Sequence, residues 1–204
     1  MIQEDSSYSL FNVITKKQSY KNILYLLLSF PLGIIYFIFI VTGISLGIGM
    51  VITIFGIFIL AGVFYAEYWI LVFEQTLVKI FFGKNLVKIT LKESDPGIWA
   101  KVKALLSDPL LWKGALFLII KYILGIISFI LTVTLISTSL ALIATPILIS
   151  IISNTYVVPF INNNPVLIPV AMAIGIFLLF ISLHICNGLA WLNFKLAEGF
   201  IKRN

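Results

Sequence analysis

Charged residues divide the chain into two long apolar stretches. No Asp, Glu, Lys or Arg occurs between Lys21 and Glu67, and none occurs between Lys121 and Lys195. A membrane-spanning helix needs about 20 predominantly apolar residues, so each stretch has room for two helices and a turn. The pattern predicts four spans, at 22–43, 48–71, 114–138 and 166–190. We therefore expect an all-α integral membrane protein.

The segment 139–165 is apolar enough to suggest a fifth span. It also contains Pro146, Pro159 and Pro165 together with Asn162–Asn164, which are residues typical of turns. We expect an extension of the third helix followed by an outside loop, and a re-entrant segment is the alternative.

Composition and charge placement support this interpretation. The chain has 61% hydrophobic and 11% charged residues, against about 45–50% and about 25% in soluble domains. Its Lys and Arg residues fall in three groups, at 16–21, 79–121 and 195–203. Because cytoplasmic loops collect Lys and Arg, we expect all three groups inside the cell. This places a multi-pass protein in the plasma membrane with both termini cytoplasmic.

The chain also repeats itself. A shift of 92 residues aligns LGIIYFI at 32–38 with LGIISFI at 124–130, and GIF at 56–58 recurs at 175–177 with a larger offset. We interpret 1–204 as a single membrane domain made by tandem duplication, with repeats 1–107 and 108–204. Each repeat would be a hairpin followed by a cytoplasmic amphipathic helix. The two repeats would have the same orientation, as in parallel-repeat folds.

Glycines at 43, 47 and 49 allow two interpretations of the stretch 42–49. One is a tight outside turn that uses the conformational freedom of glycine. The other is a packing face, because Gly43 and Gly47 have the GxxxG spacing. The position in the middle of an apolar stretch favours the turn.

Several segments are predicted at the cytoplasmic surface. The second helix would continue beyond the membrane over 67–82, with Glu67, Glu74, Gln75 and Lys79 on one face. Apolar and polar residues alternate over 85–92, which predicts a short interfacial strand.

Two copies of an S-D-P-x-x-W motif follow. Asp95 and Asp108 are predicted N-caps, each before a Pro at the first helical position. The first helix, 96–106, would lie in the membrane plane. Membrane anchoring is the favoured role of this basic and aromatic surface, and contact with a cytoplasmic partner or anionic lipid is the alternative. Its residues are Trp99, Lys101, Lys103, Trp112, Lys195, Glu198 and Lys202.

The first hairpin, YLLLSFPLGIIYFIFIVTGISLGIGMVITIFGI at 25–57, and the D-P-x-x-W-K motif at 108–113 resemble a known family. It is the putative sensor domain that precedes many actinobacterial and archaeal histidine kinases. The resemblance implies a four-helix membrane sensory module. Those kinases continue into phosphoacceptor and ATPase regions, whereas this sequence ends at Asn204. We therefore expect it to act through a separate protein.

Three polar residues are candidates for ligand binding or sensing. Glu67, His184 and Asn187 lie near the predicted inner ends of the second and fourth spans, and ionisable groups within membranes are functional candidates by default. A Glu67–His184 contact would respond to pH or to a ligand. A satisfied interhelical hydrogen bond is the favoured alternative. The third span also carries a band of hydroxyl groups, at Thr132, Thr134, Ser137, Thr138 and Ser139.

The sequence offers no catalytic constellation. It has one His and one Cys, no phosphate-binding G-x-x-x-x-G-K-[ST] and no C-x-x-C, so we expect no enzyme activity, no cofactor and no metal site. The excess of basic residues follows from topology and does not call for nucleic acid. We expect a sensor-like module that responds to a lipophilic ligand or to the bilayer state and signals through 67–82 and 190–203.

The alternatives are a permease-like subunit with an ATPase partner, or a structural membrane protein. The sequence shows no buried charge pair near the midplane, which argues against transport. Homo-oligomerisation is left open.

Overall fold

The computed structural model describes residues 16–86, 89, 97–151 and 166–201. These residues are almost entirely helical and include no strand. The helices are α2 (Lys17–Gly49), α3 (Ile54–Phe82), α4 (Ile98–Leu106), α5 (Pro109–Ile143), α6 (Thr145–Ile151) and α8 (Leu167–Ile201).

Four of these helices are long and apolar enough to cross a membrane: Lys17–Gly49, Ile54–Phe82, Pro109–Ile143 and Leu167–Phe200. The predicted all-helical fold with four spans is thus confirmed within the described residues. Most of the helices run further than the predicted spans, because their stop and start signals lie outside the apolar stretches. For example, α3 continues to Phe82 and ends at its C-cap Gly83, which has a φ of 66° and donates its N–H to the Lys79 carbonyl at 2.9 Å.

The start of α5 follows from its sequence. Asp108 is the N-cap, Pro109 occupies the first turn, and the Asp108 carboxylate accepts the Leu110 N–H at 3.0 Å. The Trp112 indole N–H bonds the Leu106 carbonyl at 2.9 Å. These contacts fix the angle between α4 and α5.

The helix that follows the first S-D-P-x-x-W motif begins later than predicted. Helix α4 begins at Ile98 with Gly97 as its N-cap, so the predicted start at 96 is two residues early. The extended backbone of Gly97 takes the capping position, and Asp95 lies outside the described residues. Of the predicted strand at 85–92, the structure describes residues 85, 86 and 89, which are not in a strand.

The glycines of 42–49 lie inside α2, and the turn comes later, at 50–53. A Cβ atom at Gly43 would lie 2.6 Å from Val63 Cγ2, and one at Gly47 would lie 2.4 Å from Leu60 Cγ. The favoured turn is therefore wrong, and the packing interpretation is correct. Helices α2 and α3 approach too closely here to accommodate a side chain.

The third span continues as expected. Helix α5 runs to Ile143 and α6 extends the helical structure to Ile151. Residues 152–165 lie outside the described part, so the choice between a loop and a re-entrant segment stays a prediction.

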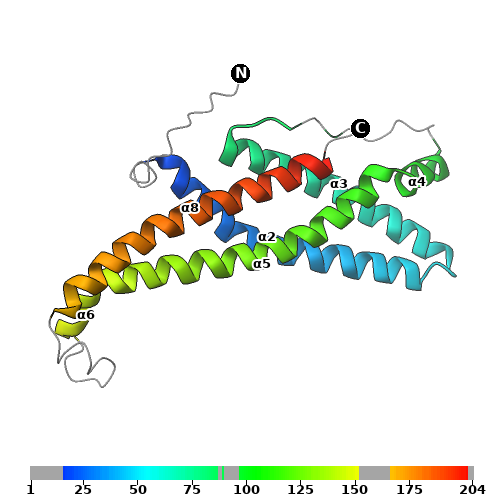
Figure 1. Cartoon of the computed structure of the whole chain (residues 1–204). Helices are drawn as coiled ribbons and strands as arrows, with labels where there is room; N and C mark the ends of the chain where they lie inside the picture. The colour runs from blue at the N-terminus through cyan, green and yellow to red at the C-terminus, as the bar shows by residue number, and fades with distance from the viewer. Residues whose placement is uncertain (1–15, 87–88, 90–96, 152–165, 202–204) are drawn as a thin grey trace.

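The two hairpins cross each other. Helix α5 makes its most extensive contacts with α2 and α8, and Figure 1 shows α2 and α5 crossing near their middles. The turn after α2 lies at the right of the view, and α6 lies at the lower left. The start of α2, the end of α3, the start of α5 and the end of α8 all lie toward the upper side.

Contacts at the crossing are reciprocal. A Cβ atom at Gly33 would lie 2.9 Å from Tyr122 Cα, and one at Gly125 would lie 2.7 Å from the Ser29 carbonyl oxygen and 3.4 Å from Phe30 Cα. Gly125 is Gly33 shifted by 92 residues, and Tyr122 is Phe30 shifted by 92. Each glycine therefore faces the equivalent part of the opposite helix.

Aromatic rings flank the crossing in the same way. The ring centroids of Phe37 and Tyr122 are 4.4 Å apart, and those of Phe30 and Phe129 are 4.6 Å apart. These pairs also exchange under the shift of 92. The duplication and its boundaries at 107 and 108 stay a prediction, which these contacts support.

Candidate functional site

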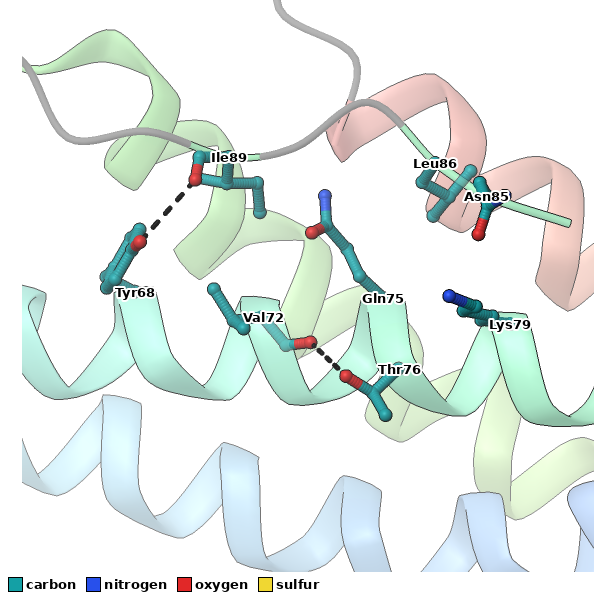
Figure 2. Close-up of a pocket in the computed structure, with 8 residues that line it drawn as sticks. All are labelled: Tyr68, Val72, Gln75, Thr76, Lys79, Asn85, Leu86 and Ile89. Carbon is teal, nitrogen blue, oxygen red and sulfur yellow. Dashed lines mark hydrogen bonds between the residues drawn. The ribbon is translucent and has the colours of Figure 1, made fainter.

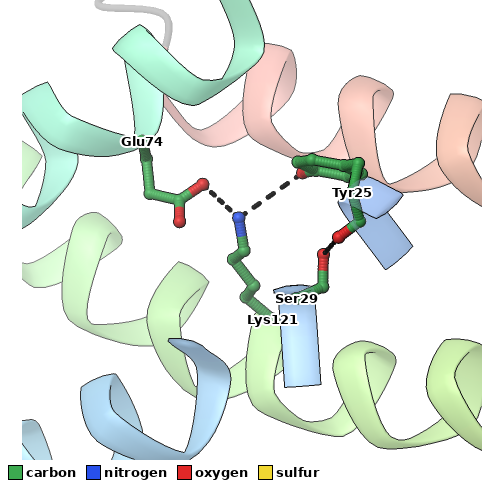
Figure 3. A network of polar contacts seen from close by, with 4 residues as sticks. All are labelled: Tyr25, Ser29, Glu74 and Lys121. Atoms are coloured by element: carbon green, nitrogen blue, oxygen red, sulfur yellow. Dashed lines mark hydrogen bonds and ion pairs between the residues drawn. The ribbon is translucent and has the colours of Figure 1, made fainter. Parts of the chain in front are cut away.

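A charged pair is buried where three helices meet. Lys121 of α5 and Glu74 of α3 form an ion pair, with side chains 3% and 0% exposed. The Lys121 ammonium also donates to the Tyr25 hydroxyl of α2 at 3.4 Å (Figure 3). The pair thus joins the second hairpin to both helices of the first.

Aromatic rings and a hydroxyl group surround this pair. The Lys121 Nζ atom lies 5.4 Å from the centroid of the Tyr25 ring and 5.9 Å from that of Phe117. The Ser29 hydroxyl donates to the Tyr25 carbonyl at 2.8 Å. The low polarity of these surroundings strengthens the attraction between the two charges. It also makes the removal of both charges from water costly in free energy.

Two oxygen atoms beside the pair are not satisfied. Glu74 Oε1 and the Tyr36 hydroxyl are buried without a hydrogen-bond partner among the described residues. An unpaired buried polar group costs free energy.

This arrangement corrects two expectations. Lys121 was expected in the cytoplasmic basic group 79–121, and Glu74 in the extension of the second helix beyond the membrane, but both side chains are buried between helices. The pair does not test the expectation about the midplane, because Glu74 lies beyond the predicted span 48–71. A sequence signal existed, because positions 67, 71, 74 and 78 form one helical face with Leu71 and Val78 on it.

Glu67 lies two turns from Glu74 on the same face. Its side chain is 0% exposed, and neither carboxylate oxygen has a hydrogen-bond partner among the described residues. A Cβ atom at Gly114 would lie 2.5 Å from Glu67 Oε1. His184 Nδ1 is also buried without a partner, so Glu67 and His184 share no hydrogen bond.

Asn187, in contrast, has partners on a neighbouring helix. Its side-chain oxygen accepts from Asn22 at 2.9 Å, and its Nδ2 donates to Ser19 at 3.2 Å. The Gln18 side chain donates to Asn22 at 2.8 Å. These bonds tie α8 to α2, which agrees with the favoured structural role. A sensing role for Glu67, His184 or Asn187 stays a proposal.

The hydroxyl band of α5 makes structural contacts. Ser139 lies 3.2 Å from the Ser182 hydroxyl and donates to the Leu135 carbonyl at 2.7 Å. The Cys186 thiol contacts the Thr132 hydroxyl at 3.6 Å. These groups bond their own backbone or bridge α5 and α8.

The predicted partner surface is exposed where it is described. Trp99 and Trp112 are 59% and 49% exposed, and Lys195 and Glu198 form an exposed ion pair at 2.8 Å. Lys101 and Lys103 are exposed on α4, and Lys202 lies outside the described residues. Whether this surface binds a partner or lipid headgroups stays a prediction.

A cavity lies against α3 on a different face from Glu74. Its volume is about 390 Å³. One wall is α3 between Tyr68 and Lys79, and the other is formed by Asn85, Leu86 and Ile89 (Figure 2). No sequence pattern indicates this cavity, because the described residues of its second wall are not in a helix or a strand.

Comparison with known families gives one match. The family model described as "Putative sensor" matches residues 25–200, a range that includes α3, α4, α5 and most of α2 and α8. Comparisons with curated proteins and with solved structures gave no match. With this match and four apolar helices long enough to span a bilayer, the chain belongs to the putative sensor family, a group of sensor-like membrane modules.

Proposed function

We propose that this protein senses a small lipophilic ligand or the state of the bilayer through a change in the relative position of its two hairpins. The cytoplasmic ends of α3 and α8 would then pass the change to a separate signalling protein. Family membership and the four apolar helices support the general role. The Glu74–Lys121 pair is the observation that carries the mechanism, because it links the hairpins.

The proposed duplication would give this site a counterpart in the other half. Tyr25 and Phe81 have ring centroids 5.5 Å apart, and Phe117 and Phe200 have theirs 5.9 Å apart. Phe117 is Tyr25 shifted by 92 residues, and Phe200 is Phe81 shifted by 119. The second offset equals that between the GIF segments, because 175 − 56 = 119.

The counterpart is neutral. With the same offsets, Lys121 corresponds to Ser29 and Glu74 corresponds to Asn193. Asn193 donates to Ser128 at 3.2 Å and to the Leu189 carbonyl at 2.9 Å. Neutral side chains therefore occupy, in the other half, the positions that correspond to the charged pair.

This comparison favours a functional role for the charged pair. Buried ion pairs are often no more stabilising than apolar replacements, because desolvation offsets their attraction. Charged residues within membrane segments usually mark function. Since the proposed duplication places neutral residues at the equivalent positions, we infer that Glu74 and Lys121 were retained for more than stability.

Contacts near the helix ends provide a route for the signal. Phe194 of α8 has its ring centroid 5.4 Å from that of Phe82 of α3. Lys84, just after α3, places its ammonium 4.5 Å from the centre of the Phe194 ring. A displacement of α3 therefore acts directly on α8.

Distances between spin labels test this mechanism. Ile80 is 60% exposed on α3, and Gly199 on α8 has open space at its Cβ position. We would label these positions in full-length protein carrying Cys186→Ala, reconstituted in lipid nanodiscs. The double variant Glu74→Gln/Lys121→Met should shift the distance distribution or add a second population.

The exposed pair on α8 supplies the matched control. Lys195→Met/Glu198→Gln removes an ion pair of the same two residue types outside the core. It should leave the distances between the spin labels unchanged. If the buried double variant gives the same distribution as the wild type, the pair does not control hairpin position.

Output to a partner needs a second experiment. Ala190, Phe194 and Ala197 are buried, so deletion of 190–203 would remove core contacts as well as surface. A photo-crosslinking residue at Lys195 in the native membrane is more selective. We expect it to capture one protein in the wild type and to capture less of it in Glu74→Gln/Lys121→Met.

A transport subunit is the second candidate function. The buried ion pair is an observation in its favour that the sequence analysis lacked. The same crosslinking separates the two hypotheses. Capture of an ATPase subunit, with ATP hydrolysis that depends on this chain, would support transport. Capture of a kinase or a transcriptional regulator would support sensing.

A further inference from the structure

We propose that the cavity beside α3 binds an amphiphile with one acyl chain and an anionic head group. The inference extends the proposed sensor function by naming a ligand class and a site. The cavity volume of about 390 Å³ falls within the range of roughly 300–1,000 Å³ found for small-molecule sites.

The cavity has both apolar and polar walls. Val72, Leu86 and Ile89 supply apolar surface, while Thr76 and Asn85 supply a hydroxyl and an amide. Figure 2 shows Tyr68, Val72 and Ile89 toward one end, and Leu86, Asn85 and the charged Lys79 toward the other. A ligand that matches both parts has an apolar tail and a polar head.

The charge of the site selects an anionic head. Among the described residues that line the cavity, Lys79 is the one charged side chain. The acidic Glu74 is fully buried in its pair with Lys121. A carboxylate or phosphate would thus meet a cation and hydrogen-bonding groups, with no competing anion among the described residues that line the cavity.

The cavity is close in sequence to the charged pair. Glu74 lies between Val72 and Gln75, which both line the cavity, but its carboxylate projects to the other side of α3 toward Lys121. A ligand that displaces this turn of α3 would therefore move Glu74. This step rests on the proposed function, whereas binding itself does not.

Photo-labelling tests the site directly. The full-length protein in phosphatidylcholine nanodiscs is irradiated with a diazirine derivative of dodecanoate, and labelled residues are located by mass spectrometry. We expect labelling within 68–86 that is competed by dodecanoate and not by dodecyltrimethylammonium. Lys79→Gln should reduce this labelling roughly tenfold, because a charge-assisted contact is lost.

Two further variants serve as controls. Val72→Phe should reduce labelling by filling the apolar part of the cavity, and Lys101→Gln should not, because Lys101 is exposed on α4 outside the cavity. Equal labelling of the wild type and Lys79→Gln, or equal competition by the cationic amphiphile, would overturn the proposal.

Nanodiscs with increasing phosphatidylglycerol identify the source of the ligand. A decrease of dodecanoate labelling with anionic lipid shows that a bilayer phosphate head group fills the site, and constant labelling shows a free amphiphile. Both results support an anionic amphiphile site. Labelling that persists while the spin-label distances stay unchanged would retain this site and reject the sensing mechanism.

Discussion

Gly33 and Gly125 lie on α2 and α5 where these helices cross, and each faces the backbone of the other helix. A Cβ atom at Gly33 would lie 2.9 Å from Tyr122 Cα, and one at Gly125 would lie 2.7 Å from the Ser29 carbonyl oxygen. Backbone atoms cannot move aside as a flexible side chain can. The absence of both side chains therefore sets the distance between the hairpins.

The first prediction concerns this crossing. Gly125→Ala should destabilise the protein by about 1–3 kcal/mol, the usual cost of overpacking, and should lower the thermal unfolding midpoint in detergent micelles. Gly188→Ala on α8 is the control, because open space surrounds its Cβ position. The control should be neutral or stabilising. Equal effects of the two substitutions would contradict close packing at the crossing.

The second prediction concerns the energetics of the buried pair. Lys121→Met alone should cost about 3–5 kcal/mol, because it leaves Glu74 as an uncompensated buried charge. Addition of Glu74→Gln should recover most of that loss. Unfolding free energies of the two single variants and the double variant measure this coupling. Additive losses would show that the two side chains do not interact.

The third prediction concerns the start of α5. Asp108→Ala should cost about 1 kcal/mol, because the Leu110 N–H loses its acceptor. Asp108→Ser keeps a capping oxygen and should retain most of the stability. The thermal midpoints of the two variants give the comparison, and a Ser variant as unstable as the Ala variant would reject the capping role.

The fourth prediction concerns Glu67 and Gly114. A side chain at Gly114 would collide with Glu67 Oε1 at 2.5 Å and with Leu71 Cδ1 at 2.6 Å, so Gly114→Ala should destabilise the protein. Glu67→Ala removes one of the two collisions. The loss caused by Gly114→Ala should therefore be smaller in the Glu67→Ala background, and an unchanged loss would show that Glu67 does not pack there.

Local features of the chain were predictable because their signals are local. The two uncharged stretches give the four long helices, and the Asp-Pro pair at 108–109 places the start of α5. The favoured turn at 42–49 failed because a glycine allows a turn and close packing equally well. Only the positions of Val63 and Leu60 distinguish the two.

The candidate site was not predictable in the same way. Lys121 stands at the edge of an apolar stretch, where a sequence pattern cannot separate a solvated residue from a buried one. The pairing depends on how α3 lies beside α5, with 114 beside 67 and 121 beside 74. The two residues of each pair are 47 positions apart in the sequence. This constant separation is the register between α3 and α5, which neither helix sets alone.

The order of apolar and charged residues is enough to predict four membrane-spanning helices and a repeated segment, because hydrophobicity and charge act residue by residue along the chain. Which polar side chains meet depends on the folded structure, since contacts between helices depend on their crossing and register. The glycine contacts at 33 and 125 bring Glu74, Lys121 and Tyr25 together. Glu74 and Lys121, which lie on opposite sides of the segment that joins α3 to α5, thus form one buried ion pair.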